Sequence, residues 1–163
     1  MHLLFRLIPA ALCLAPLSAR AAVVRVEIRE RADAGTTGYE QLTCKLHFEI
    51  DPKQPRNAII ADVDLAPVNA AGKVSFTADL RLWKPKDGSR SNGAAWVEIP
   101  NRGGKGSLSK SLMEQGFTML NVGWKADVTD KKDALRLEVP GAKNKAGPPV
   151  RGVVSAQFTP DKK

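Results

Sequence analysis

Apolar and polar residues alternate along much of the chain after residue 21, which is the pattern of a half-buried β-strand. The first half contains four such segments, at 24–28, 42–50, 59–65 and 74–82. The second of them ends at Asp51-Pro52, where proline cannot donate to a strand ladder. An antiparallel, all-β meander is the simplest arrangement of these segments.

The second half breaks this alternation with a glycine-rich loop and a short helix. Its predicted elements are a strand at 96–99, a helix that Ser107 caps and that runs through Gln115, and strands at 117–122, 135–139 and 150–158. Strand, helix and strand within about 30 residues match the size of a βαβ unit. The sequence therefore predicts a β-rich α+β fold in which antiparallel strands lead into a strand-helix-strand unit.

The first 21 residues have the layout of a secretory signal peptide. Arg6 precedes an apolar run at 7–17, and Ala19-Arg20-Ala21 is the small-x-small pattern that a signal peptidase cleaves. The run is shorter than the ~20 apolar residues that a membrane-spanning helix needs. We therefore expect an exported protein, periplasmic or extracellular, with a signal peptide at 1–21, a single β-rich domain at 22–163 and no transmembrane span.

Composition narrows the chemistry further. The chain of 163 residues has 25 Lys+Arg, 17 Asp+Glu, two histidines and two cysteines. Cleavage after Ala21 removes Arg6 and Arg20, which lowers the formal net charge from +8 to +6. It leaves Cys44 and His47 as the sole residues of their types, too few for a disulfide or for the usual zinc site. We expect no metal and no cofactor.

No motif of a catalytic nucleophile is present, because the sequence contains no G-x-S-x-G elbow. His47 is interpreted as an exposed strand histidine, and Cys44 as a buried, inert thiol. Asp62 and Asp64 would project from the same face of a strand. That spacing suits a cation site or a glycosidase pair, but the solvated face of an amphipathic strand is the preferred interpretation.

The basic surplus is spread over loops and forms no single patch. Its local pairs are Lys84/Lys86, Lys131/Lys132, Lys143/Lys145 and Lys162/Lys163. Aromatic residues do not interleave with them as in a stacking platform, so no nucleic acid partner is expected. For an exported protein, anionic glycans or the envelope surface are better partners than DNA, and general solubility is the preferred explanation of the basic surplus.

A series of short phrases stands in a fixed order along the chain. They are Tyr39-Glu40 with Leu42, His47-Phe48-x-x-Asp51-Pro52, Pro55-x-Asn57, Asp62-x-x-Leu65-Ala66-Pro67-x-Asn69-Ala70-x-Gly72, Val97-Glu98-Ile99-Pro100-Asn101-Arg102-Gly103, and Gln115-Gly116-Phe117 followed by Gly123-Trp124-x-x-Asp127. Together they resemble the N-terminal portion of the bacterial alpha/beta hydrolase domain-containing proteins, over nearly all of residues 22–163.

The resemblance implies an exported serine hydrolase that acts on an ester. Its catalytic serine elbow would lie in a part that this chain lacks, so we expect the incomplete N-terminal part of an α/β-hydrolase fold, inactive alone. The expected partner is a complementary hydrolase segment or, in a full-length context, an ester substrate. The loop Asn101-Arg102-Gly103 would supply a backbone N–H of the oxyanion hole, and a tight strand-to-helix turn is the alternative.

Two other hypotheses stay open. One is a secreted β-rich binding module for a glycan, in which Trp83 and Trp96 are exposed stacking platforms for a sugar ring. The other is an interaction module whose open sheet edge accepts a strand from a protein partner.

Overall fold

The computed structural model describes residues 22–104, 106, 108–128 and 133–151. The predicted signal peptide at 1–21 lies outside these residues, as does nearly all of the strand predicted at 150–158. The described elements form one mixed sheet of six strands in the order β1-β2-β3-β5-β4, with β6 also paired to β3. The β-rich prediction is thereby confirmed.

The strands are β1 (Ala22–Asp33), β2 (Tyr39–Ile50), β3 (Val74–Pro85), β4 (Ala95–Glu98), β5 (Thr118–Val122) and β6 (Leu137–Glu138). Within the described residues there is one α-helix, α1 (Lys110–Glu114). Short 3-10 turns cover Pro55–Asn57, Val63–Leu65, Gly88–Arg90 and Asn101–Gly103. Five strands predicted from the sequence exist, with bounds that differ by a few residues: those at 24–28, 42–50, 74–82, 96–99 and 117–122. The strand predicted at 135–139 is reduced to β6.

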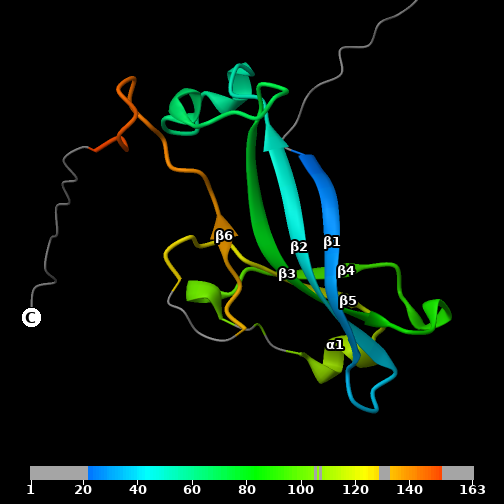
Figure 1. Cartoon of the computed structure of the whole chain (residues 1–163). Coiled ribbons are helices and arrows are strands. Elements are labelled where there is room, and N and C mark those ends of the chain that lie inside the picture. Colours follow the sequence, from blue (N-terminus) through cyan, green and yellow to red (C-terminus); the bar gives the residue numbers. More distant parts are fainter. Residues whose placement is uncertain (1–21, 105, 107, 129–132, 152–163) are drawn as a thin grey trace, which may run out of the picture.

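The long strands form the predicted antiparallel meander (Figure 1). β2 and β3 pair along their whole length, from Tyr39 opposite Pro85 to Ile50 opposite Val74. β1 is an edge strand whose register with β2 shifts twice, between Val23 and Arg25 and again between Ile28 and Glu30. Irregularities of this kind on an edge strand hinder pairing with a further strand.

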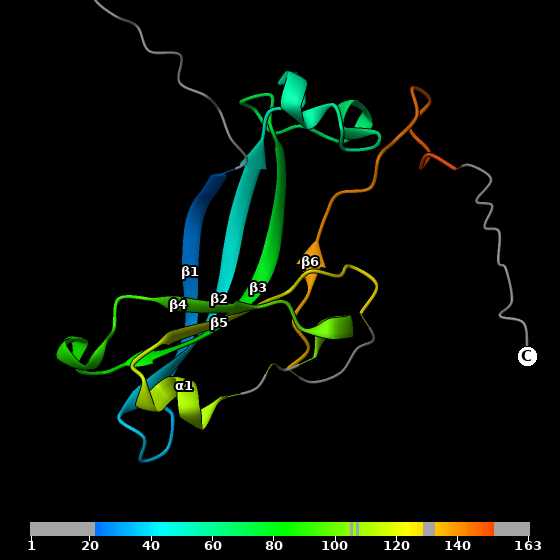
Figure 2. The same ribbon diagram turned by 180° about the vertical axis from the view of Figure 1, so that it is seen from behind.

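The predicted strand-helix-strand unit is also present. β4 and β5 are parallel neighbours, from Ala95 beside Thr118 to Glu98 beside Asn121, and α1 lies in the connection between them. Ser109, rather than the predicted Ser107, caps this helix by accepting a hydrogen bond from the N–H of Leu112 at 3.4 Å. In Figures 1 and 2, β4 and β5 lie at the lower part of the sheet and run crosswise to the direction that the three long strands take above them.

The prediction of a strand at 59–65 is wrong. Residues 59–62 form turns, Asp62 is left-handed at φ 55°, and Val63–Leu65 is a 3-10 turn. Asp62 and Asp64 consequently do not share the face of a strand. The segment covers one end of the sheet, where Val63 packs with Ile50 and Val74.

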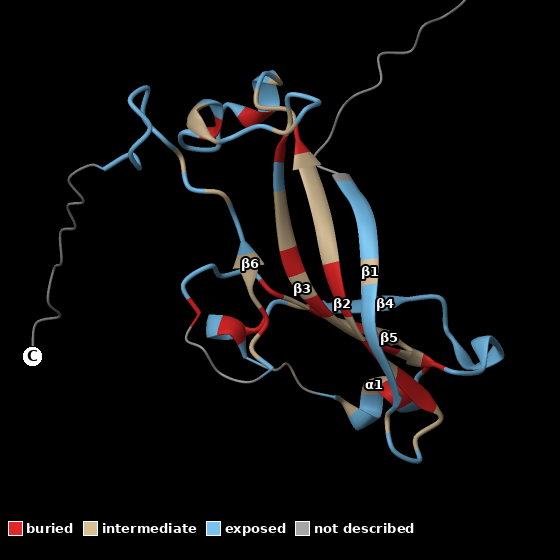
Figure 3. Ribbon diagram, in the orientation of Figure 1, coloured by how far each residue is buried: buried red, intermediate tan, exposed pale blue. Residues whose placement is uncertain are grey.

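The buried side chains gather on β2 and β3 and on both faces of the sheet (Figure 3). One face carries the cluster of Leu42, Cys44 and Leu80. The other carries the cluster of Tyr39, Trp83, Met113 and Met119, against which α1 packs. By contrast, the apolar side chains of β1 are about half exposed. Among the described residues, no helix has the length and apolar character to span a membrane.

Candidate functional site

The parallel arrangement of β4 and β5 brings the loops that follow the two strands to the same edge of the sheet. In open sheets with parallel strands, ligands bind in the crevice at the carboxyl ends of the strands. A cavity of about 330 Å³ opens at this place. Its lining residues are Ile99, Pro100, Asn101, Arg102, Trp124 and Lys125, and we call it the carboxyl-end crevice. Four of them follow β4 and two follow β5.

The wall that follows β4 is a tight turn in an unusual conformation. Arg102 (φ 50°, ψ 38°) and Gly103 (φ 69°) are both left-handed, and the N–H of Gly104 donates to the carbonyl of Asn101 at 3.1 Å. For a residue with a β-carbon, the left-handed conformation costs about 1–2 kcal/mol. Strain of this size persists where the surrounding structure holds it, and such positions cluster at binding and active sites.

Segment 134–138 holds both walls of the crevice. The N–H of Leu135 donates to the carbonyl of Gly103 at 3.2 Å, and the N–H of Leu137 donates to the carbonyl of Lys125 at 3.0 Å. Leu135 is buried, and it lies with Val128 against the backbone of Gly103. One segment is therefore hydrogen-bonded to the backbone of both loops and links them.

The crevice combines a solvent-exposed indole ring with a guanidinium that has no ion-pair partner among the described residues. Trp124 is 65% exposed. Arg102 is exposed too, and within the described part of the chain its guanidinium has no ion-pair or hydrogen-bond partner. Lys125, in contrast, is paired with the carboxylate of Asp127 at 3.3 Å. An aromatic face, a free guanidinium and the amide of Asn101 are groups that bind polar ring compounds.

The residues of the predicted oxyanion loop lie at this site. Asn101 and Arg102 line the crevice, and Gly103 is buried directly behind them. The turn conformation agrees with the alternative of a tight strand-to-helix turn. The oxyanion role stays a prediction.

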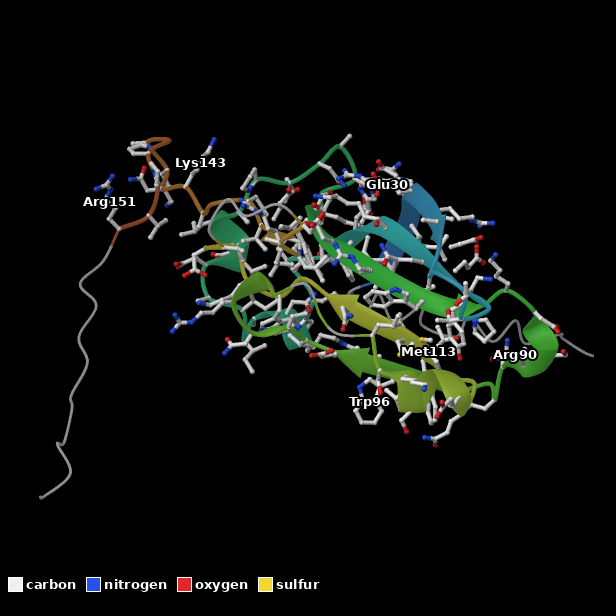
Figure 4. The ribbon with its side chains drawn as sticks, turned by 90° about the horizontal axis from the view of Figure 1, so that it is seen from below. Glu30, Arg90, Trp96, Met113, Lys143 and Arg151 are labelled. Carbon is white, nitrogen blue, oxygen red and sulfur yellow. The ribbon has the colours of Figure 1, made fainter. Side chains whose placement is uncertain are left out.

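The predicted pair of stacking platforms, Trp83 and Trp96, is corrected by the structure. Trp83 is only 5% exposed, and its indole N–H donates to the side chain of Gln41 at 3.0 Å. Its register suggested a polar face, but α1 covers that face at this end of the sheet. Trp96 is exposed as predicted, and it projects outward from β4 (Figure 4). It is not among the residues that line the crevice.

Trp124 was not assigned a role from the sequence, although it stands in one of the phrases that carry the family resemblance. The sequence pattern could have identified it, because Gly123-Trp124 directly follows the second strand of a predicted βαβ unit, and ligand-binding loops begin at this position. Gly123 is required there because a β-carbon at this position would meet the backbone of Arg136.

None of the crevice residues is a serine, threonine, cysteine or histidine. Cys44 is buried on the apolar face as predicted, and burial raises the pKa of its thiol. His47 is half-buried rather than exposed, and its imidazole lies 3.0 Å from a carboxylate oxygen of Glu27 and 2.7 Å from the guanidinium of Arg25. A nucleophile for the crevice does not come from these residues.

A buried lysine crosslinks three strands, β2, β3 and β6, on the polar face of the sheet. The ammonium of Lys45 lies 2.9 Å from Glu138 and 3.1 Å from Asp79, and Glu138 also accepts from the hydroxyl of Thr77 at 2.7 Å. Burial lowers the pKa of Lys45, but the hydrogen bonds with Glu138 and Asp79 outweigh it and leave this pKa raised. The hydrogen bond from Lys45, followed by that from Thr77, lowers the pKa of Glu138.

A larger cavity of about 520 Å³ lies beside this network and His47. The charged groups at its wall already bond to one another, as the contacts of Arg25 and Glu138 show. In the part of the chain that the structure describes, no three His, Cys, Asp or Glu side chains come together as metal ligands would.

Comparison of the chain with family models, with curated proteins and with solved structures returned no match. The site therefore has to be interpreted from its own geometry.

Proposed function

We propose that this chain is a ligand-binding module of an exported hydrolase-type protein, with the carboxyl-end crevice as its binding site. The ligand is an ester, as the resemblance to the N-terminal portion of alpha/beta hydrolase domain-containing proteins implies. The nucleophile comes from a complementary segment, so the chain alone is inactive. The observation that carries the proposal is the position of the crevice at the carboxyl ends of β4 and β5.

The surface of the sheet supports a complementary segment. A sheet buries its apolar side chains against another element, and among the described residues α1 covers a single end of one face. Val97 and Ile99, beside the crevice, are more than half exposed, and so are Val24, Val26 and Ile28 of β1. Apolar side chains exposed in this number favour contact with a further polypeptide.

The first test separates binding from turnover. Residues 22–163 would be mixed with p-nitrophenyl butyrate, and release of p-nitrophenol would be followed. We expect the rate in buffer alone, because the crevice contains no hydroxyl or thiol nucleophile. Turnover by the purified chain, retained after active-site titration has excluded a contaminating esterase, would overturn this part of the proposal.

The second test measures binding of the amide analogue of that ester by calorimetry. Trp124→Leu removes the exposed ring of the crevice and should weaken binding at least tenfold. Trp96→Leu is the matched control, since Trp96 is an exposed indole of the same domain that does not line the crevice. Equal losses in the two variants, or none in Trp124→Leu, would contradict the assignment of the site.

Export is part of the proposal. β1 begins at Ala22, so cleavage after Ala21 would leave every described element intact. Expression of the full chain in a bacterium, followed by mass determination of the protein in the periplasm or the medium, should give a mature N-terminus at Ala22. Uncleaved protein in the cytoplasm would contradict it.

A glycan is the second candidate ligand. The exposed indole of Trp124 favours it, because a pyranose ring stacks on such a face. The pair of Trp83 and Trp96 that the sequence suggested does not favour a glycan, since Trp83 is buried. Strand addition by a protein partner is the weakest of the three hypotheses, because two register shifts and alternating charges protect the edge of β1.

A further inference from the structure

We propose that the ester bound in the carboxyl-end crevice is an ester of an acidic sugar, whose pyranose ring carries a free carboxylate besides the ester bond. The inference rests on the proposed function, because it names the class of ligand that the same crevice binds. It follows from three features of the crevice: its size, the pairing of its charges and the backbone conformation of Arg102.

The size of the crevice limits the ligand to a small one. A cavity of about 330 Å³ lies at the lower end of the range for ligand pockets, ~300–1,000 Å³. A single ring with its substituents fits such a space. The exposed ring of Trp124 provides a flat face on which a ring can stack.

The charges of the crevice favour an anion. Of its two cations, Lys125 already has a carboxylate partner in Asp127. Arg102 has none among the described residues, so its guanidinium is available for a ligand. A guanidinium binds a carboxylate through two parallel hydrogen bonds, which are charge-assisted and directional. A neutral sugar offers this group no charge-assisted hydrogen bond.

The backbone of Arg102 indicates that its position matters. Its left-handed conformation is one that asparagine or glycine adopts more readily than arginine. The arginine is thus held at a conformational cost, next to a glycine that is itself left-handed and buried. An aspartate at the same place would be less strained and would repel the ligand.

The experiment compares three probes on residues 22–163 by calorimetry: glucuronate, which has a ring and a carboxylate, glucose, which has the ring alone, and acetate, which has the carboxylate alone. We expect glucuronate to bind at least tenfold more tightly than either of the others. Its affinity should also fall between 50 mM and 300 mM salt, whereas that of glucose should not, because added salt screens an exposed charge.

Variants assign the contribution of each residue. Arg102→Asn removes the charge and keeps a residue that tolerates the left-handed conformation, and it should weaken glucuronate about tenfold without changing the affinity for glucose. Arg102→Gly should behave identically, which guards against a folding defect in one variant. Trp124→Leu should weaken both sugars, because it removes the exposed ring of the crevice.

Equal affinity for glucose and glucuronate, or no effect of either Arg102 variant on glucuronate, would overturn the inference. Binding of acetate as tight as that of glucuronate would overturn it as well, because the ring would then contribute nothing. If the amide analogue of the ester binds in a Trp124-dependent way while glucuronate does not, this inference alone fails. If neither binds, the proposed function fails with it.

Discussion

Gly103 is the residue on which the shape of the carboxyl-end crevice depends most, and its replacement by alanine tests the structure directly. Its φ of 69° is left-handed, which costs a residue with a β-carbon about 1–2 kcal/mol. The added β-carbon would also meet the side chain of Val128 and the carbonyl oxygen of Leu135, the latter at 2.9 Å. Overpacking of a buried site costs about 1–3 kcal/mol. We therefore expect Gly103→Ala to destabilise the domain by about 2–5 kcal/mol.

Three other glycines separate these two causes. Gly72 is left-handed at φ 71° but has open space around it, so Gly72→Ala should cost only the backbone strain of about 1–2 kcal/mol. Gly123 has no positive φ but lies against the backbone of Arg136, so Gly123→Ala should cost only the overpacking. Gly88 has neither constraint, and Gly88→Ala should be neutral or stabilise by up to about 1 kcal/mol.

Urea unfolding of residues 22–163, followed by tryptophan fluorescence, measures all four variants. Trp83 is buried and therefore reports the loss of the core. With a slope m of about 1–3 kcal/mol/M, a loss of 3 kcal/mol shifts the midpoint by about 1–3 M. If Gly103→Ala loses no more stability than Gly72→Ala, the close packing of Val128 and Leu135 behind the crevice is refuted.

Three further predictions concern the sheet itself. Lys45→Met should cost about 1–3 kcal/mol at pH 7, because it removes the one ammonium that Glu138 and Asp79 share within the described residues. Folding lowers the pKa of Glu138 below 4.5, so this carboxylate stabilises the folded state above pH 4.5 and loses that contribution as the pH falls through the lowered pKa. The urea midpoint of Lys45→Met should therefore depend less on pH below 4.5 than the midpoint of the wild type. Cys44 is 4% exposed and burial raises the pKa of its thiol, so a disulfide reagent should label it only at urea concentrations that unfold the domain, and rapid labelling of the native protein would contradict its placement. The buried amide nitrogen of Asn121 has no hydrogen-bond partner within the described residues, so Asn121→Leu should leave the free energy of unfolding within about 1 kcal/mol or raise it, and a loss above ~2 kcal/mol would mean that the amide is bonded.

The local pattern of apolar and polar residues was sufficient to predict a strand where that strand has one buried and one polar face. The alternation along β2 and β3 predicted both strands, and the glycine-rich loop between two apolar segments predicted the parallel unit of β4, α1 and β5. Cys44 was placed correctly for the same reason, since its neighbours in the alternation are apolar on the side where it lies.

Pattern failed where distant segments decide burial. Residues 59–65 alternate like a strand, but they turn over the end of the sheet because Asp62 is left-handed and Val63 finds its contacts with Ile50 and Val74. Trp83 stands on the polar side of its strand and is nevertheless buried, because α1, contributed by residues about 30 positions later, covers that end of the face.

By itself, the amino-acid sequence determined five of the six strands closely, the short helix and the loop that carries Asn101 and Arg102, because periodicity and turn residues act over a few neighbouring positions. Only the tertiary structure decided that Trp124 joins this loop in one crevice, because the parallel pairing of β4 and β5 brings together segments more than 20 residues apart. It also decided that Arg102 keeps a free charge while Lys125 does not. Charge pairing and burial depend on the distances between segments, which no local pattern contains.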